Sequence, residues 1–178
     1  MAKYVLGHQA QIRSRAIRYT LLVGILLLTV AVLQVSFFGR FRFLGASPDL
    51  MICTTLCIAY FSGRYMGAVT GIAAGFLIEA LGTEGVMLLA VCYLFLGYLA
   101  GHYAKITPSG YTTYLLYLGV TLVYRAAITV LYACLNYQTV RLPDILLYSV
   151  LPEMLLTAIA GCVMYFPLYL YCKWLDKK

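Results

Sequence analysis

The sequence has few charged residues for its length, and this shortage decides the class of protein. Only 11% of its 178 residues are charged, whereas 63% are hydrophobic, and the mean hydropathy is +0.90. A soluble domain carries charge on about a quarter of its residues. The apolar residues also form long blocks, and a membrane-spanning helix needs about 20 of them in succession. The chain is therefore predicted to be one all-α integral membrane domain.

The sequence also lacks the motifs that commonly mark an enzyme or a metal site. It contains no H-E-x-x-H, no G-x-S-x-G and no nucleotide-binding glycine loop. All six cysteines fall inside the predicted membrane domain, where Cys53 and Cys57 share a helix face without a nearby histidine to complete a metal site. We therefore expect a protein that is not an enzyme, with no catalytic residues, no metal and no cofactor.

The apolar blocks predict a bundle of six membrane helices. The predicted spans are approximately residues 19–38, 48–62, 65–81, 86–103, 112–135 and 148–171, within a membrane domain of residues 19–172. A basic segment at 1–18 precedes this domain, and a basic tail at 173–178 follows it. The second span is the shortest, and the number of spans falls to five if that helix re-enters the membrane without crossing it.

The positions of Lys and Arg predict the orientation in the membrane. Three of the 13 basic residues fall in the predicted outer loops (Arg40, Arg42 and Arg141), and nine fall on the side of the two termini (Lys3, Arg13, Arg15, Arg18, Arg64, Lys105, Lys173, Lys177 and Lys178). Cytoplasmic loops are enriched in basic residues, so both termini are predicted to be cytoplasmic. This orientation and anionic lipid explain the net charge of +7, and no nucleic-acid partner is expected.

Glycines recur at helical spacing in two of the predicted spans. Gly67, Gly71 and Gly75 lie four residues apart on one stripe, and Gly97 and Gly101 form a second stripe. Lipid tails are as apolar as leucine, so membrane helices associate largely through close packing of small residues. The five glycines are therefore predicted contact sites, either between helices of this protein or with a partner.

Three ionisable residues fall inside predicted spans, namely Glu79, Arg125 and Glu153. Such residues are costly in a membrane and are candidates for function. The depths of Arg125 and Glu153 differ by about 8 Å along their helices, which two long side chains can bridge. We therefore predict an ion pair between them, and we favour pairing over a catalytic use. Glu79 lies near the outer end of its helix, where it is predicted to meet headgroups or water.

Several short stretches occur in a characteristic order along nearly the whole chain. They are the basic N-terminus with a long first helix, SPDLM at 47–51 with a turn at Pro48 and Asp49, GAVTGIAAGFLIEALG at 67–82, GYLAG at 97–101, and LPEMLLTAIAGCVMYFPLY at 151–169. Their order and spacing resemble the rod shape-determining protein MreD family. The chain departs from the family pattern at two positions: Arg125 stands where an acidic residue is expected, and Thr157 where an amide is expected.

The resemblance implies a function that residue chemistry alone does not show. MreD-like proteins are non-enzymatic members of the bacterial elongasome in the cytoplasmic (inner) membrane. They bind MreC, a single-span protein, and through it RodA, a class B penicillin-binding protein and MreB, and they support lateral peptidoglycan synthesis and rod cell shape. Their six-helix fold is similar to the substrate-binding component of energy-coupling-factor transporters.

That similarity leaves a second function open, a substrate-binding component of a vitamin transporter. A transport component would present small-residue contacts for a coupling subunit on its first and third helices. The first helix here contains Gly24 and Ala31 but no pair of alanines four residues apart, which favours the scaffold.

Overall fold

The computed structural model is a bundle of α-helices, and it describes residues 2–38, 47–81, 88–107, 110–136 and 150–177. Within these ranges there are six α-helices and no β-strand: α1 (Ala2–Leu33), α2 (Leu50–Ser62), α3 (Arg64–Leu81), α4 (Leu88–Tyr103), α5 (Tyr111–Asn136) and α7 (Leu151–Lys177). A π-helical segment, η1 (Gln34–Phe38), continues α1. The predicted all-α class is confirmed.

Three helices are long and apolar enough to cross a membrane. They contain the segments Ile17–Phe37, Tyr111–Leu131 and Leu151–Trp174. The helices α2 and α4 are also apolar, but their 13 and 16 residues are fewer than the roughly 20 that a perpendicular crossing needs. The prediction of a membrane-embedded protein is confirmed at this level, and six crossings stay a prediction.

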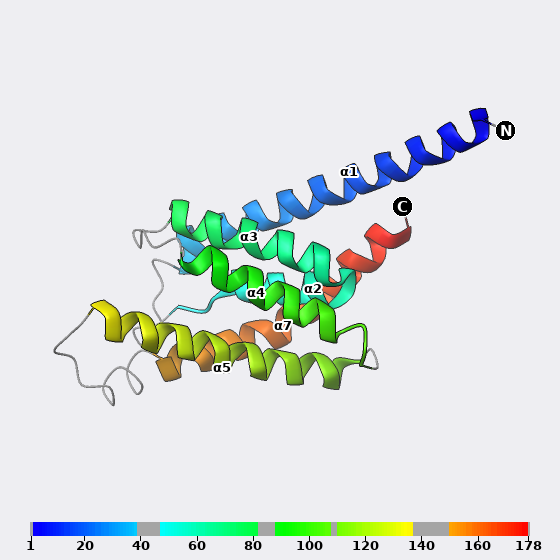
Figure 1. The fold of residues 1–178 in the computed structure, drawn as a ribbon. Helices are drawn as coiled ribbons and strands as arrows, with labels where there is room; N and C mark the ends of the chain where they lie inside the picture. Colours follow the sequence, from blue (N-terminus) through cyan, green and yellow to red (C-terminus); the bar gives the residue numbers. More distant parts are fainter. Residues whose placement is uncertain (1, 39–46, 82–87, 108–109, 137–149, 178) are drawn as a thin grey trace.

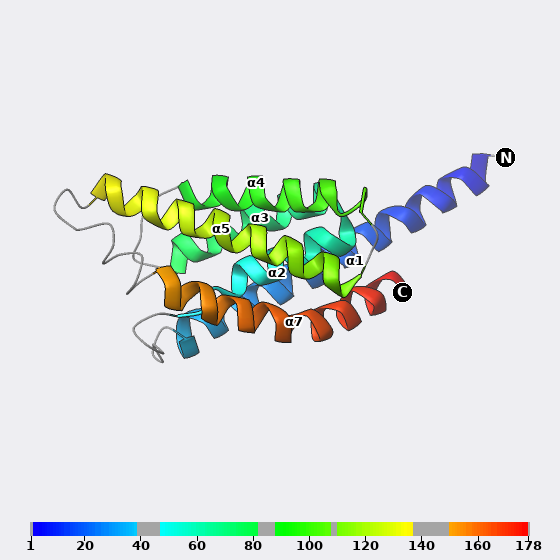
Figure 2. The same cartoon turned by 90° about the horizontal axis from the view of Figure 1, so that it is seen from below.

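Successive helices run in opposite directions along the bundle (Figures 1 and 2). The beginning of α1 and the end of α7 consequently lie at the same end of the molecule, and the first half of α1 projects beyond the other helices. The bounds of α2 to α5 lie within two residues of the predicted spans. By contrast, α1 begins at Ala2 and α7 continues to Lys177, because hydropathy marks only the part of a helix that suits lipid.

Some sequence predictions concern residues outside the described ranges. These are the basic residues of the expected outer loops, Arg40, Arg42 and Arg141, and the predicted starts of two helices at residues 86–87 and 148–149.

The short helix α2 occupies the centre of the bundle. Its residues from Leu50 to Tyr60 are all buried, and it contacts α1, α3, α4, α5 and α7 (Figures 1 and 2). A helix that is apolar on every side suits such a position. Thirteen residues extend only about 20 Å, so α2 alone does not span a hydrocarbon core about 30 Å thick, and a crossing here also needs residues outside the helix. Polar backbone groups at an end inside that core need partners from the protein itself.

The glycine stripes bring α3 and α4 into backbone contact. A Cβ atom at Gly71 would overlap the carbonyl group of Tyr93, and one at Gly75 would overlap the backbone of Ala90. Gly67 and Gly97 face each other in the same way. Gly101 also packs against backbone, because a Cβ atom at this position would overlap the backbone of Gly63 and Arg64. Of the two possibilities left open by the sequence, the structure shows packing between helices of this protein at all five glycines.

Candidate functional site

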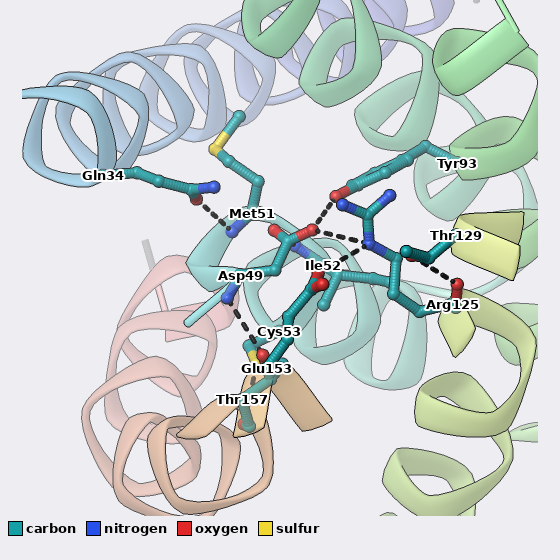
Figure 3. A network of polar contacts seen from close by, with 10 residues as sticks. All are labelled: Gln34, Asp49, Met51, Ile52, Cys53, Tyr93, Arg125, Thr129, Glu153 and Thr157. Atoms are coloured by element: carbon teal, nitrogen blue, oxygen red, sulfur yellow. Dashed lines mark hydrogen bonds and ion pairs between the residues drawn. The ribbon is translucent and has the colours of Figure 1, made fainter. Parts of the chain in front are cut away.

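A polar cluster surrounds the start of α2 inside the bundle (Figure 3). Asp49 is the N-cap residue of this helix, and its Oδ1 accepts a hydrogen bond from the backbone N–H of Ile52 at 3.1 Å. The side-chain Oε1 of Gln34 accepts from the N–H of Met51 at 3.0 Å. A carboxylate at this position also interacts favourably with the helix dipole. Donors that lipid could not satisfy are therefore bound by side chains.

Helix α7 supplies a third contact to the same turn. The hydroxyl Oγ1 of Thr157 accepts a hydrogen bond from the backbone N–H of Asp49 at 3.0 Å, and Thr157 is only 1% exposed. Thr157 stands where the resemblance noted in the sequence led us to expect an amide. The structure shows that a hydroxyl provides a polar contact at this position without the expected amide.

Arg125 of α5 connects two carboxylates in the cluster. Its Nε lies 3.2 Å from Oε1 of Glu153 and 3.5 Å from Oδ2 of Asp49 (Figure 3). The pairing of Arg125 with Glu153 was predicted from their depths and is confirmed. The hydroxyl of Tyr93, on α4, donates a hydrogen bond to the same Oδ2 of Asp49. The charge of Arg125 is thus neutralised by Asp49, at the N-cap of α2, and by Glu153 of α7.

The two carboxylates beside Arg125 differ in distance and in burial, and these two properties rank them in opposite order. Glu153 is closer by a few tenths of an ångström, but its side chain is 19% exposed, whereas that of Asp49 is 4% exposed. Charge–charge energy rises steeply as the surroundings become less polarisable. Burial strengthens the interaction more than a few tenths of an ångström of distance weakens it, so Asp49 is the principal counter-ion of Arg125.

The cluster includes residues that the sequence did not single out for this role. Asp49 was expected only as part of a turn, and Gln34 and Tyr93 were not identified. One available signal was an acidic residue directly before an apolar helix too short to cross the membrane. Such a helix must begin inside the membrane, so the acidic residue needs a cation at the same depth.

The remaining acidic candidate, Glu79, does not belong to the cluster. Its Oε1 accepts a hydrogen bond from the backbone N–H of Ala90 at 3.2 Å, in the first turn of α4. A carboxylate is favourable at the positive end of a helix dipole. Glu79 therefore connects the end of α3 to the start of α4. The glycine stripes keep the same two helices in contact along their length.

The arrangement fixes helices relative to one another. Its side chains come from η1, the start of α2, α4, α5 and α7, so the cluster joins five segments of the chain (Figure 3). Within the described residues, no group of three or more His, Cys, Asp or Glu side chains is placed to hold a metal ion. The contacts seen here are structural, between groups of the protein itself.

Comparisons with known proteins add no relative: neither the family models, nor the curated proteins, nor the solved structures contain a match to this chain. The geometry of the bundle and the order of features along the sequence are therefore the observations that bear on its function.

Proposed function

We propose that this protein is a non-enzymatic membrane scaffold of the bacterial elongasome. In this role it binds an MreC-like single-span protein, and through it RodA, a class B penicillin-binding protein and MreB. It thereby supports lateral peptidoglycan synthesis and rod cell shape. The order of sequence features supports the family, and one structural observation supports the scaffold role.

That observation is the use made of the buried ionisable groups. Arg125 contacts both Asp49 and Glu153. Asp49 also makes contacts to the backbone N–H of Ile52, to Thr157 and to Tyr93. A transporter or an enzyme typically points such groups at a ligand. Here they hold the bundle together, which suits a protein that acts through its outer surface.

The proposal includes six crossings with both termini in the cytoplasm of a bacterial inner membrane. The two termini lie at the same end of the bundle, as an even number of crossings requires (Figure 1). Arg64 at the start of α3, Lys105 after α4 and Lys173 near the end of α7 lie at that same end. Basic residues are enriched on the cytoplasmic side, which supports this orientation.

Co-purification from native membranes tests the proposal. The full-length protein is tagged at its C-terminus and extracted in mild detergent, and the proteins that follow it are identified by mass spectrometry. We expect a single-span MreC-like protein to be enriched over a control in which an unrelated multi-pass protein carries the tag. Recovery of a coupling subunit, its ATPases and a bound vitamin would instead favour the energy-coupling-factor component and contradict the scaffold.

A further inference from the structure

A cavity of about 330 Å³ lies between α4 and α5, where the two helices diverge. Its lining is shared between four residues of α4 (Leu96, Leu99, Ala100 and Tyr103) and four of α5 (Tyr117, Val120, Thr121 and Tyr124). Hereafter this cavity is called the α4–α5 groove. The seven-residue interval from Leu96 to Tyr103 makes it about 10 Å long.

One end of the groove is bounded by the turn that follows α4. The hydroxyl of Thr107 donates to the carbonyl oxygen of Tyr103 at 3.1 Å and lies 2.8 Å from the hydroxyl of Tyr117. This turn contains Lys105, whose side chain is exposed and extends over Gly63, next to Arg64. The groove is therefore apolar along its length, and the turn that bounds one end carries the positive charge of Lys105, whose side chain lies towards the start of α3.

We propose that the α4–α5 groove binds one acyl chain of an anionic phospholipid, with the phosphate beside Lys105. The inference goes beyond the scaffold function and does not depend on it. The lipid belongs to the leaflet on the side of the two termini, because α4 ends at that end of the bundle (Figure 1) and Lys105 follows α4 directly.

The size of the groove favours a chain over a helix. A water molecule takes about 30 Å³, and a methylene group is of similar size, so 330 Å³ accommodates on the order of eleven methylene groups. A helix with its side chains is about 10–12 Å across, so a 10 Å length of it fills roughly 800–1,100 Å³. A single acyl chain therefore fits inside this space, whereas a whole helix does not.

The chemistry at the end of the groove favours an anionic headgroup. Lys105 and Arg64 provide positive charge near the membrane surface, and basic residues there attract anionic lipids. Tyr103 and Tyr117 line the groove, and the hydroxyl of Tyr117 contacts Thr107 in the turn that contains Lys105, which suits rings at a membrane interface.

Thermal unfolding of the purified full-length protein in detergent tests the site. Phosphatidylglycerol and phosphatidylcholine with identical acyl chains are titrated separately. We expect a saturable rise in melting temperature with both lipids, with half of the rise reached at a phosphatidylglycerol concentration at least fivefold lower. An equal response to the two headgroups would overturn the role of Lys105.

Matched variants separate the two parts of the site. Ala100→Leu fills the groove and should abolish the saturable response to both lipids. Gly119→Leu adds the same kind of bulk at a position with no atom near its Cβ and should retain both responses. Lys105→Gln should lose only the preference for phosphatidylglycerol, and Lys173→Gln should keep it. A wild-type response in Ala100→Leu would refute binding in the groove.

Photo-crosslinking in native membranes identifies the occupant independently of variant folding. A benzophenone amino acid replaces Leu99, which lines the groove and is 46% exposed. We expect adducts with the mass of a phospholipid. A discrete crosslinked band with the mass of a second protein would overturn the proposal and show that a partner occupies this position.

Discussion

Helix α4 contacts α3 and α5, two of its neighbours, in different ways. Towards α3 it packs backbone against backbone, because Gly67 and Gly71 leave no side chain between the helices. Towards α5 it diverges, and a hydrogen bond from the hydroxyl of Tyr124 to the carbonyl of Cys92 connects the pair beside the groove. Small residues and polar contacts are the two main means of associating helices in lipid, and this chain uses each on one side of the same helix.

The difference predicts two kinds of sensitivity. The α3–α4 contact has no room for added atoms, so it should be sensitive to the size of a side chain. The position of α5 depends on Arg125, which binds carboxylates on two other segments, so it should be sensitive to charge and hydrogen-bonding capacity. Substitutions that change size or charge alone distinguish the two regions.

Removing the carboxylate of Asp49 should have the largest effect. Asp49→Leu deprives Arg125 of its most buried counter-ion and α2 of its N-cap, so we expect a loss of about 3–5 kcal/mol in stability. Thermal unfolding in detergent measures it. Asp49→Asn keeps an oxygen for the N–H of Ile52 and should lose less. Identical melting of the Leu variant and the wild type would show that the cluster does not stabilise the fold.

Adding a side chain between α3 and α4 should rank second. In Gly71→Leu the new side chain meets the backbone at Tyr93 and holds the two helices apart, at a cost of about 1–3 kcal/mol. The same measurement applies, together with the yield from membranes. Gly24→Leu is the matched control, since nothing lies near a Cβ at that position. Equal losses in the two variants would contradict close packing as the source of the effect.

The two carboxylates around Arg125 should differ in coupling strength. Double-mutant cycles combine Arg125→Gln with Asp49→Asn in one case and with Glu153→Gln in the other. We expect a coupling of about 2 kcal/mol for Asp49 and about 1 kcal/mol for Glu153, because Asp49 is the more buried partner. The opposite ranking would mean that the shorter distance to Glu153 outweighs burial.

The contact of Glu79 should have the smallest effect. Glu79→Gln keeps an oxygen for the N–H of Ala90 but removes the charge at the start of α4, so we expect a loss of about 0.3–1 kcal/mol. High salt should reduce the difference between the variant and the wild type, which melting curves at two ionic strengths can measure. A loss as large as that of Asp49→Leu would contradict the assignment of Glu79 to helix capping.

Sequence reasoning predicted where the helices lie along the chain better than which helices pack against one another. The spans of α2 to α5 followed from apolar blocks bounded by turn residues such as Gly63, whose φ of 88° suits glycine. The ion pair of Arg125 and Glu153 followed from depth alone, because charged groups in lipid must find partners. The glycine stripes predicted close contact but could not reveal that α4 provides it.

The rest of the cluster depends on distant parts of the chain. Thr157 and Tyr93 contact Asp49 across 108 and 44 positions, so their roles arise only when the helices assemble. Gln34 begins a π-helical segment, and the apolar pattern of the first span gave no sign of that change in winding. The sequence identified which groups needed partners in the membrane, and the tertiary structure identified the partners.

Cell shape after depletion tests the central claim most directly. The protein is depleted from a rod-shaped bacterium that carries it, and cell width and lateral incorporation of new peptidoglycan are imaged with and without added vitamins. The scaffold account predicts that cells become round and that lateral incorporation falls, with no rescue by the supplement. Cells that remain rods, stop growing and recover on a vitamin would contradict it.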